Sequence, residues 1–148
     1  MKKIDALIIG RGPAGIQAAI YLKRANMNTI VVGKDLGATE KSVAVENYFG
    51  IPSLTGKELL AIGEKQLEHF EVPLLTDEVL SLTYTEDGIV VEAIEDTFLA
   101  TTVLIATGSK RSIPRVRNIL KYEGKGVSYC AVCDGFFFKD KKVAVIGA

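Results

Sequence analysis

The pattern of apolar and polar residues at the start of the chain predicts a strand, a helix and a second strand. Residues 3–9 form a short run rich in Ile and Leu that ends at a glycine, as buried strands often do. Residues 13–25 have apolar side chains at helical spacing and begin with Pro13, which suits a first helical turn. Residues 29–32 are again apolar. This order predicts a βαβ unit with parallel strands and a right-handed crossover.

The pattern changes period in the rest of the chain. Residues 33–53 show little periodicity and indicate a loop, whereas residues 56–70 have the apolar spacing of a helix. Residues 79–93 alternate around the pair Asp87-Gly88, which predicts an antiparallel hairpin, and residues 98–105 predict another strand. The expected fold class is therefore α/β: a Rossmann-like βαβ domain with an antiparallel β insertion.

Composition narrows the class of protein. The 148 residues suffice for one ordinary domain, and 48% hydrophobic and 24% charged residues are typical of a soluble globular protein. Eighteen basic residues balance eighteen acidic ones, which argues against nucleic acid or a membrane as the main partner. The first apolar run is too short for a signal peptide, and no run approaches a membrane span. We therefore expect a cytoplasmic protein.

The segment IIGRGPAG places Gly10, Gly12 and Gly15 in the pattern G-x-G-x-x-G. Between a strand and a helix, the first glycine permits a tight turn, the second lets the backbone approach a pyrophosphate, and the third lets helix and strand pack closely. The N-terminus of the helix offers free N–H groups to the anion. The alternative is a glycine-rich turn without a ligand, which this context disfavours. Such loops bind both NAD and FAD, so the motif does not choose between them.

Asp35 is a candidate for binding the ribose of the dinucleotide. It follows Gly15 at about the distance, roughly 20 residues, at which such an acid is expected. Gly33 and Lys34 separate it from the end of the predicted strand, which leaves its role open.

Both cysteines of the chain, Cys130 and Cys133, lie in the segment SYCAVCDGFFF. A zinc site needs about four ligands, and the two cysteines with the lone His69 supply three. Two inert buried cysteines are a further alternative, and His69 is better explained as a surface or packing residue. A redox pair fits best, because this spacing allows the sulfurs to close a small disulfide ring and to exchange with a second disulfide.

Asp134 directly follows the second cysteine. A carboxyl group there can give a proton to a leaving thiolate or take one from an attacking thiol. A helix cap is the alternative explanation, and the two roles are compatible.

Taken together, these motifs resemble the low-molecular-weight thioredoxin reductases. The likeness extends from IIGRGPAG through VENYFGIP and LIATGSK to GVSYCAVCDGFFF and KKVAVIGA, in the order and spacing of that family. The glycine loop and the Ala-Thr-Gly segment would suit many flavoproteins. The segment CAVCDG just before a second strand-to-glycine element is much more specific.

The resemblance implies FAD as cofactor, reduction of thioredoxin or a similar dithiol protein, and a homodimer. It implies that Cys130 attacks the partner's disulfide, that Cys133 lies nearer the flavin, and that Asp134 transfers protons. The residues it implies in FAD binding belong to five segments of the chain: Gly10, Gly12, Pro13, Ala14 and Gly15; Asp35 and Gly37; Asn47; Val79; and Thr107 and Gly108.

The resemblance also implies a division into domains. Residues 1–109 would be the N-terminal part of an FAD-binding domain and residues 110–126 a polar linker. Residues 127–148 would begin a second domain of the pyridine-nucleotide type, with VAVIGA as its first strand, so the chain resembles the N-terminal portion of a longer enzyme.

NADPH is the expected electron donor, although its site would lie outside this chain. The loop GKDLGATEKS is one residue shorter than the corresponding family segment and lacks its Gly-Gly-Gln-Leu sequence, so the flavin environment and the donor can differ. Ferredoxin or another donor is therefore an alternative. A second alternative is a flavin-binding sensor module that does not turn over.

Overall fold

The computed structural model describes residues 4–109 and 112–146, and it begins with the βαβ unit that the sequence predicts. Its first strand pairs in parallel with the second, in the register Ala6 with Thr29 through Ile9 with Val32. Lys3, the first residue of the predicted strand, lies outside the described residues. The three elements are β1 (Ile4–Ile9), α1 (Pro13–Arg24) and β2 (Thr29–Val32).

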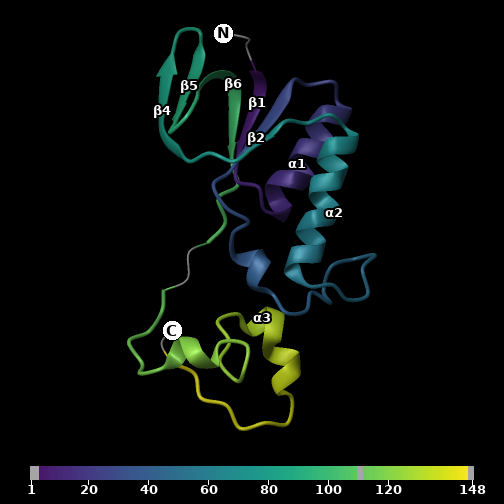
Figure 1. Cartoon of the computed structure of the whole chain (residues 1–148), viewed down its shortest axis with the longest axis vertical. Helices are drawn as coiled ribbons and strands as arrows, with labels where there is room; N and C mark the ends of the chain where they lie inside the picture. The colour runs from purple at the N-terminus through teal and green to yellow at the C-terminus, as the bar shows by residue number, and fades with distance from the viewer. Residues whose placement is uncertain (1–3, 110–111, 147–148) are drawn as a thin grey trace.

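The sheet has six strands in the order β3-β2-β1-β6-β5-β4 (Figure 1). The neighbouring strands β3, β2, β1 and β6 are parallel to one another. Strand β5 pairs with both β6 and β4 in antiparallel fashion. This is the expected Rossmann-like α/β fold with an antiparallel β insertion. The further strands are β3 (Leu74–Leu75), β4 (Val79–Thr85), β5 (Gly88–Ala93) and β6 (Thr97–Ile105).

Two details of the strands differ from the prediction. The hairpin loop consists of Glu86 and Asp87, because Thr85 pairs with Gly88 at the start of β5. Gly88 is needed for space as well as for its φ of 141°, since a Cβ there would lie 2.7 Å from the carbonyl oxygen of Ala100 in β6. The sequence did not indicate β3, which is too short to show a period of two.

The helix α2 (Gly56–His69) begins at a capping box. The hydroxyl of Thr55 accepts a hydrogen bond from the backbone N–H of Glu58, and the Glu58 carboxylate accepts one from the backbone N–H of Thr55 at 2.8 Å. Farther along, Gly63 lets α2 approach α1 closely, because a Cβ there would lie 2.9 Å from Cδ1 of Ile16.

Hydrophobic clusters lie on both faces of the sheet. The side chains of successive strand residues point to opposite faces, so Ile8 packs against α1 and α2 whereas Leu7 packs toward the hairpin. In Figure 1 the two helices lie side by side next to the parallel strands, and the hairpin of β4 and β5 forms the edge of the sheet that is away from them. The buried residues of the helical side are Ile8, Ile16, Ala19, Val31, Leu60, Leu67 and Val72.

Residues 112–146 lie beyond the carboxyl ends of β1 and β6, apart from the sheet (Figure 1). They contain only short helices: η2 (Ile119–Tyr122), α3 (Ala131–Asp134) and η3 (Gly135–Phe138). The expected strand at VAVIGA is not formed by residues 143–146, and residues 147–148 lie outside the described part. A strand needs a neighbour to satisfy its backbone groups, and no described strand pairs with this segment.

None of the described helices is both long enough and apolar enough to span a membrane.

Candidate functional site

The glycine loop between β1 and α1 is held against the ends of two other strands. The backbone N–H of Gly10 donates to the carbonyl of Val32 at 2.7 Å. Gly10 has a φ of 116°, and a Cβ there would lie 2.2 Å from the carbonyl oxygen of Ala106. A side chain at this position would therefore be strained and would clash with backbone.

The other two glycines of the loop have different surroundings. A Cβ on Gly15 would lie 2.0 Å from the carbonyl oxygen of Gly10, so the helix packs closely on the loop. Around Gly12 the space is open, because apart from its chain neighbours no atom lies within 4 Å of the position of a Cβ. Gly12 is the N-cap of α1 and no side chain caps this helix. The first turn of α1 thus offers backbone N–H groups beside an open surface, which fits the pyrophosphate of a dinucleotide.

The end of β6 lies beside this loop. The backbone N–H of Ala106 donates to the carbonyl of Ile9 at 2.8 Å, which places Thr107 and Gly108 next to the glycine loop. Both residues are exposed, and Gly108 has a φ of 70°. The structure therefore brings together two predicted segments that are almost 100 residues apart in sequence.

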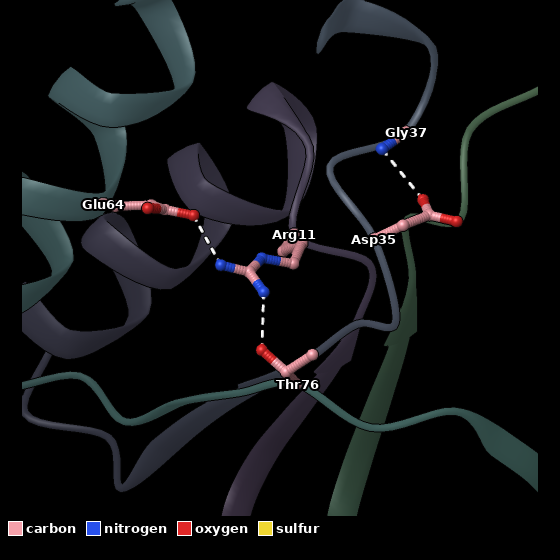
Figure 2. A network of polar contacts seen from close by, with 5 residues as sticks. All are labelled: Arg11, Asp35, Gly37, Glu64 and Thr76. Carbon is pink, nitrogen blue, oxygen red and sulfur yellow. Dashed lines mark hydrogen bonds and ion pairs between the residues drawn. The ribbon is translucent and has the colours of Figure 1, made fainter. Parts of the chain in front are cut away.

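Asp35 and Gly37 form a turn just after β2. The carboxylate of Asp35 accepts a hydrogen bond from the backbone N–H of Gly37 at 2.8 Å, as Figure 2 shows, and both residues are exposed. Gly37 has a φ of 67°, which favours glycine. The two residues therefore lie at the carboxyl edge of the sheet, as a role in binding a ribose requires.

The start of β4 is tied to the same edge. The ammonium of Lys34 bonds the carboxylate of Glu78 at 2.7 Å, and this hydrogen bond and charge raise the pKa of Lys34. Val79 follows directly and is half-buried against the cluster around Leu7, so its backbone rather than its side chain is available at this edge.

The remaining residues predicted for the dinucleotide lie near the start of α1. Ala14 is exposed on the first turn of the helix. Pro13 lines a cavity of about 160 Å³ between α1, α2 and the loop that contains Tyr48 and Ile51. Asn47 is exposed and lies one residue before this cavity wall. The residue after Asn47, Tyr48, thus lines the same cavity as Pro13.

Cys130 and Cys133 are joined by a disulfide, with their Cα atoms 5.3 Å apart. Cys130 is the N-cap of α3, and its sulfur accepts a hydrogen bond from the backbone N–H of Cys133 at 3.1 Å. Cys133 is exposed and Cys130 is half-buried. The pair is thus accessible to a second disulfide, unlike two inert cysteines in a core.

A metal centre finds no support in the part of the chain that the structure describes. It contains no group of three or more His, Cys, Asp or Glu side chains that could hold an ion. His69 is exposed at the last position of α2 and packs edge-to-face on Phe70, with ring centroids 5.0 Å apart.

Asp134 interacts with a residue that the sequence did not single out. Its carboxylate accepts a hydrogen bond from the hydroxyl of Ser128 at 2.6 Å. The same hydroxyl accepts from the backbone N–H of Cys130 at 3.1 Å. The side chain of Asp134 makes no capping hydrogen bond to α3 or η3, so the alternative explanation of a helix cap is not supported. Ser128 connects the acid to the backbone of the disulfide ring instead.

Arg11, at the variable position of the glycine motif, was also missed. Its side chain leaves the loop and reaches α2 and the segment between β3 and β4, as Figure 2 shows. Nη2 bonds the Glu64 carboxylate at 2.6 Å, and Nη1 donates to the Thr76 hydroxyl at 2.7 Å. The sequence signal for Arg11 was its charge, because the other residues of the loop are small or apolar.

The sequence profile of the family described as pyridine nucleotide-disulphide oxidoreductase matches residues 4–148. The chain belongs to this family.

Within the family, the chain is similar to thioredoxin reductases along nearly its whole length. It is 38% identical over 146 residues to that of Ureaplasma parvum and 39% identical over 153 residues to that of Aquifex aeolicus. These alignments cover 97% and 99% of this chain but 47% and 46% of the relatives. The chain thus spans about half the length of the curated relatives it matches.

Solved structures agree with this comparison. The thioredoxin reductase of Streptococcus pyogenes superposes with a TM-score of 0.87 at 37% identity, covering 93% of this chain and 46% of that one. The atypical thioredoxin reductase of Desulfovibrio vulgaris superposes with a TM-score of 0.68 at 40% identity, covering 91% and 46%.

Proposed function

We propose that the protein is a flavin-dependent oxidoreductase that reduces thioredoxin or a similar small protein disulfide. The observation that carries this proposal is the presence, in one chain, of an open glycine loop suited to a dinucleotide and of an accessible disulfide with a neighbouring acid. Its similarity to thioredoxin reductases supports the choice of reaction.

FAD is the proposed cofactor, and the residues present fit it. Gly12 leaves open space beside the uncapped first turn of α1, where a pyrophosphate can approach the backbone N–H groups. The exposed carboxylate of Asp35 suits a ribose hydroxyl. Bound FAD would supply the two electrons that reduce the disulfide. The proposed binding residues are Gly10, Gly12, Pro13, Ala14, Gly15, Asp35, Gly37, Asn47, Val79, Thr107 and Gly108.

The reduced cysteines then carry out disulfide exchange. The Cys130 thiolate attacks one sulfur of the target disulfide, and a mixed disulfide forms as the other target sulfur leaves. The Cys133 thiolate attacks Cys130 next, which restores the Cys130–Cys133 bond and releases the second target sulfur. Two electrons and two protons thereby pass to the target. Asp134, held by Ser128, is the proposed proton donor and acceptor.

NADPH is the proposed donor of the electrons. The family description names pyridine nucleotides, which favours NADPH over ferredoxin, and the reductases among the relatives favour turnover over a sensor role. We also retain as proposals the domain division at residues 1–109, 110–126 and 127–148, a homodimer and a cytoplasmic location.

The Cys130→Ser variant tests the proposed reaction. We expect it to bind FAD normally and to lose thioredoxin reduction, because the sulfur proposed to attack the target is gone. The measurement is NADPH-dependent reduction of thioredoxin, with flavin content read from the visible spectrum.

Cys133→Ser is the matched control. It retains the attacking sulfur but lacks the resolving one, so a stable mixed disulfide with thioredoxin should accumulate. Normal turnover by Cys130→Ser would refute the assignment, and a single stoichiometric reduction by the wild-type protein would show a sensor instead of an enzyme.

A further inference from the structure

Arg11 connects the glycine loop to two other parts of the molecule (Figure 2). Its guanidinium bonds Glu64 in α2 and Thr76 in the segment between β3 and β4, which lie 53 and 65 residues away in sequence. We propose that Arg11 is a positioning residue that fixes the backbone of the glycine loop for dinucleotide binding. This inference rests on the proposed function, because it deepens the role of the FAD site.

The burial of this contact makes it suited to hold the loop. The side chain of Arg11 is only 14% exposed and that of Glu64 is 34% exposed. By contrast, both partners of the Lys34–Glu78 pair at the same edge are more than 40% exposed. Water and salt screen a shielded ion pair less than an exposed one, and hydrogen bonds to a charged group are the stronger kind.

The guanidinium is not placed to satisfy all of its own donors. Its Nε is buried and has no hydrogen-bond partner among the residues that the structure describes. An unpaired buried donor is unfavourable for folding. The two terminal nitrogens therefore determine the position of the side chain.

Backbone hydrogen bonds hold the loop at Gly10 and Gly12, but these glycines offer no side chains that could fix the loop further. Gly10 and Gly12 are conformationally permissive, and Gly12 as N-cap provides no side chain to cap α1. In the described structure, Arg11 is the loop residue whose side chain makes hydrogen bonds to other elements. Gly33 makes room for it, since a Cβ there would lie 2.9 Å from the backbone nitrogen of Arg11.

Holding the loop in one conformation lowers the entropy that binding must lose. A ligand that binds through backbone N–H groups needs them at fixed positions beforehand, and an unfixed loop binds more weakly although every contact residue is still present. Arg11 thus acts on the dinucleotide through the loop backbone, with Glu64 and Thr76 as its anchors.

The test compares Arg11→Met and Glu64→Gln in the complete protein. Both variants keep the approximate shape of the side chain and remove the ion pair. After the flavin is removed, FAD affinity is measured by titration, and hydrogen exchange of residues 10–15 is measured without FAD. We expect each variant to weaken FAD binding by about tenfold and to accelerate exchange in the loop. The double variant should bind FAD no more weakly than Arg11→Met, because the two residues form one contact.

Lys23→Met is the matched control. Lys23 also joins α1 to the chain beyond α2, through its contact with the carbonyl of Glu71, but at the opposite end of the helix. The Lys23→Met variant should leave both the affinity for FAD and the hydrogen exchange of the loop unchanged. The proposal is overturned if Glu64→Gln binds FAD like the wild type, since Arg11 would then act without its anchor. If the wild-type protein binds no FAD, the proposed function fails. The role of Arg11 is then decided by whether Arg11→Met accelerates hydrogen exchange of residues 10–15.

Discussion

At the scale of single residues, the three glycines of the dinucleotide loop are required for different reasons. Gly10 is required by the fold, because its φ is 116° and because a Cβ on it would overlap the carbonyl oxygen of Ala106. Gly15 is required by the contact of the helix with the loop. A Cβ on Gly12 would meet no atom beyond the chain neighbours of this residue, so the fold itself does not require a glycine there. What Gly12 preserves is open space, and this is an argument for a ligand.

Substituting Gly12 by Ala separates these requirements. We expect Gly12→Ala to change the free energy of unfolding of the flavin-free protein by less than about 0.5 kcal/mol, because the added methyl group meets open space. FAD binding should nevertheless weaken, because the methyl group occupies the path of the pyrophosphate. Denaturant unfolding and FAD titration of the same samples measure the two effects.

Gly10→Ala serves as the comparison for this experiment. It should lose on the order of 2 kcal/mol or more of stability, because the residue is strained at positive φ and its Cβ overlaps a carbonyl oxygen. If Gly12→Ala were as destabilising as Gly10→Ala, the open surface described here would be incorrect.

At the scale of elements, the N-terminus of α2 shows how local side chains determine where a helix begins. Thr55 and Glu58 each accept a hydrogen bond from the backbone of the other, which satisfies N–H groups that the helix leaves unpaired. The helix then presents Leu60, Gly63 and Leu67 to the core and Glu64 to Arg11. The helix that begins at this capping box therefore also carries the partner of Arg11.

The capping box leads to a prediction about pH. The hydrogen bond from the backbone N–H of Thr55, followed by that from its hydroxyl, lowers the pKa of Glu58. A lowered pKa in the folded state means that Glu58 stabilises the protein above its ordinary pKa, and that this contribution is lost as the pH falls through the folded value. Glu58→Gln should therefore show a weaker loss of stability toward acid than the wild type, measured by thermal unfolding between pH 3 and 7.

Thr55→Ala tests the same box from the other side. It should lower the free energy of unfolding by about 1 kcal/mol at neutral pH, where the cap is intact. It should reduce the acid dependence only in part, because Glu58 loses the hydrogen bond from the hydroxyl but keeps the one from the backbone N–H of residue 55. An unchanged acid dependence in both variants would contradict the role of Glu58.

At the scale of the whole molecule, the two proposed sites lie in parts of the chain that differ in how well their side chains are buried. The glycine loop is held between strand ends and helices around a well-buried core. The disulfide lies in a segment of short helices in which Val132 is 89% and Phe136 79% exposed. The carboxyl ends of the parallel strands point toward this segment (Figure 1), so both sites lie at or beyond the carboxyl edge of the sheet.

This arrangement predicts that FAD stabilises the sheet without needing the cysteines. Adding FAD to the flavin-free protein should raise its melting temperature, with a gain of about 2.7 kcal/mol when free FAD is 100 times its dissociation constant. The Cys130→Ser/Cys133→Ser variant should show the same shift. A shift that disappears in this variant would mean that the disulfide segment takes part in holding the cofactor.

Much of the fold could be predicted from the sequence because its signals are local. The bounds of β2 and the end of β1 are as predicted, and those of α1, α2 and β6 differ by one residue. The signals used, namely the apolar period, Pro13 and the glycines, act on neighbouring residues. The hairpin was predicted for the same reason, although its loop lies one residue earlier. The segment VAVIGA has a strand-like sequence but forms no strand over residues 143–146, because strand formation also depends on a partner.

The sequence by itself determined the βαβ unit, the glycine loop and the pairing of the two cysteines by spacing, because each is written in residues close together along the chain. Only the tertiary structure decided that Gly10 lies against Ala106, that Arg11 is anchored by Glu64 and Thr76, and that Ser128 holds Asp134. These contacts depend on chain directions and on helix packing. Contacts between distant residues leave no periodic signal in one sequence, so folding must bring the partners together before their chemistry can be recognised.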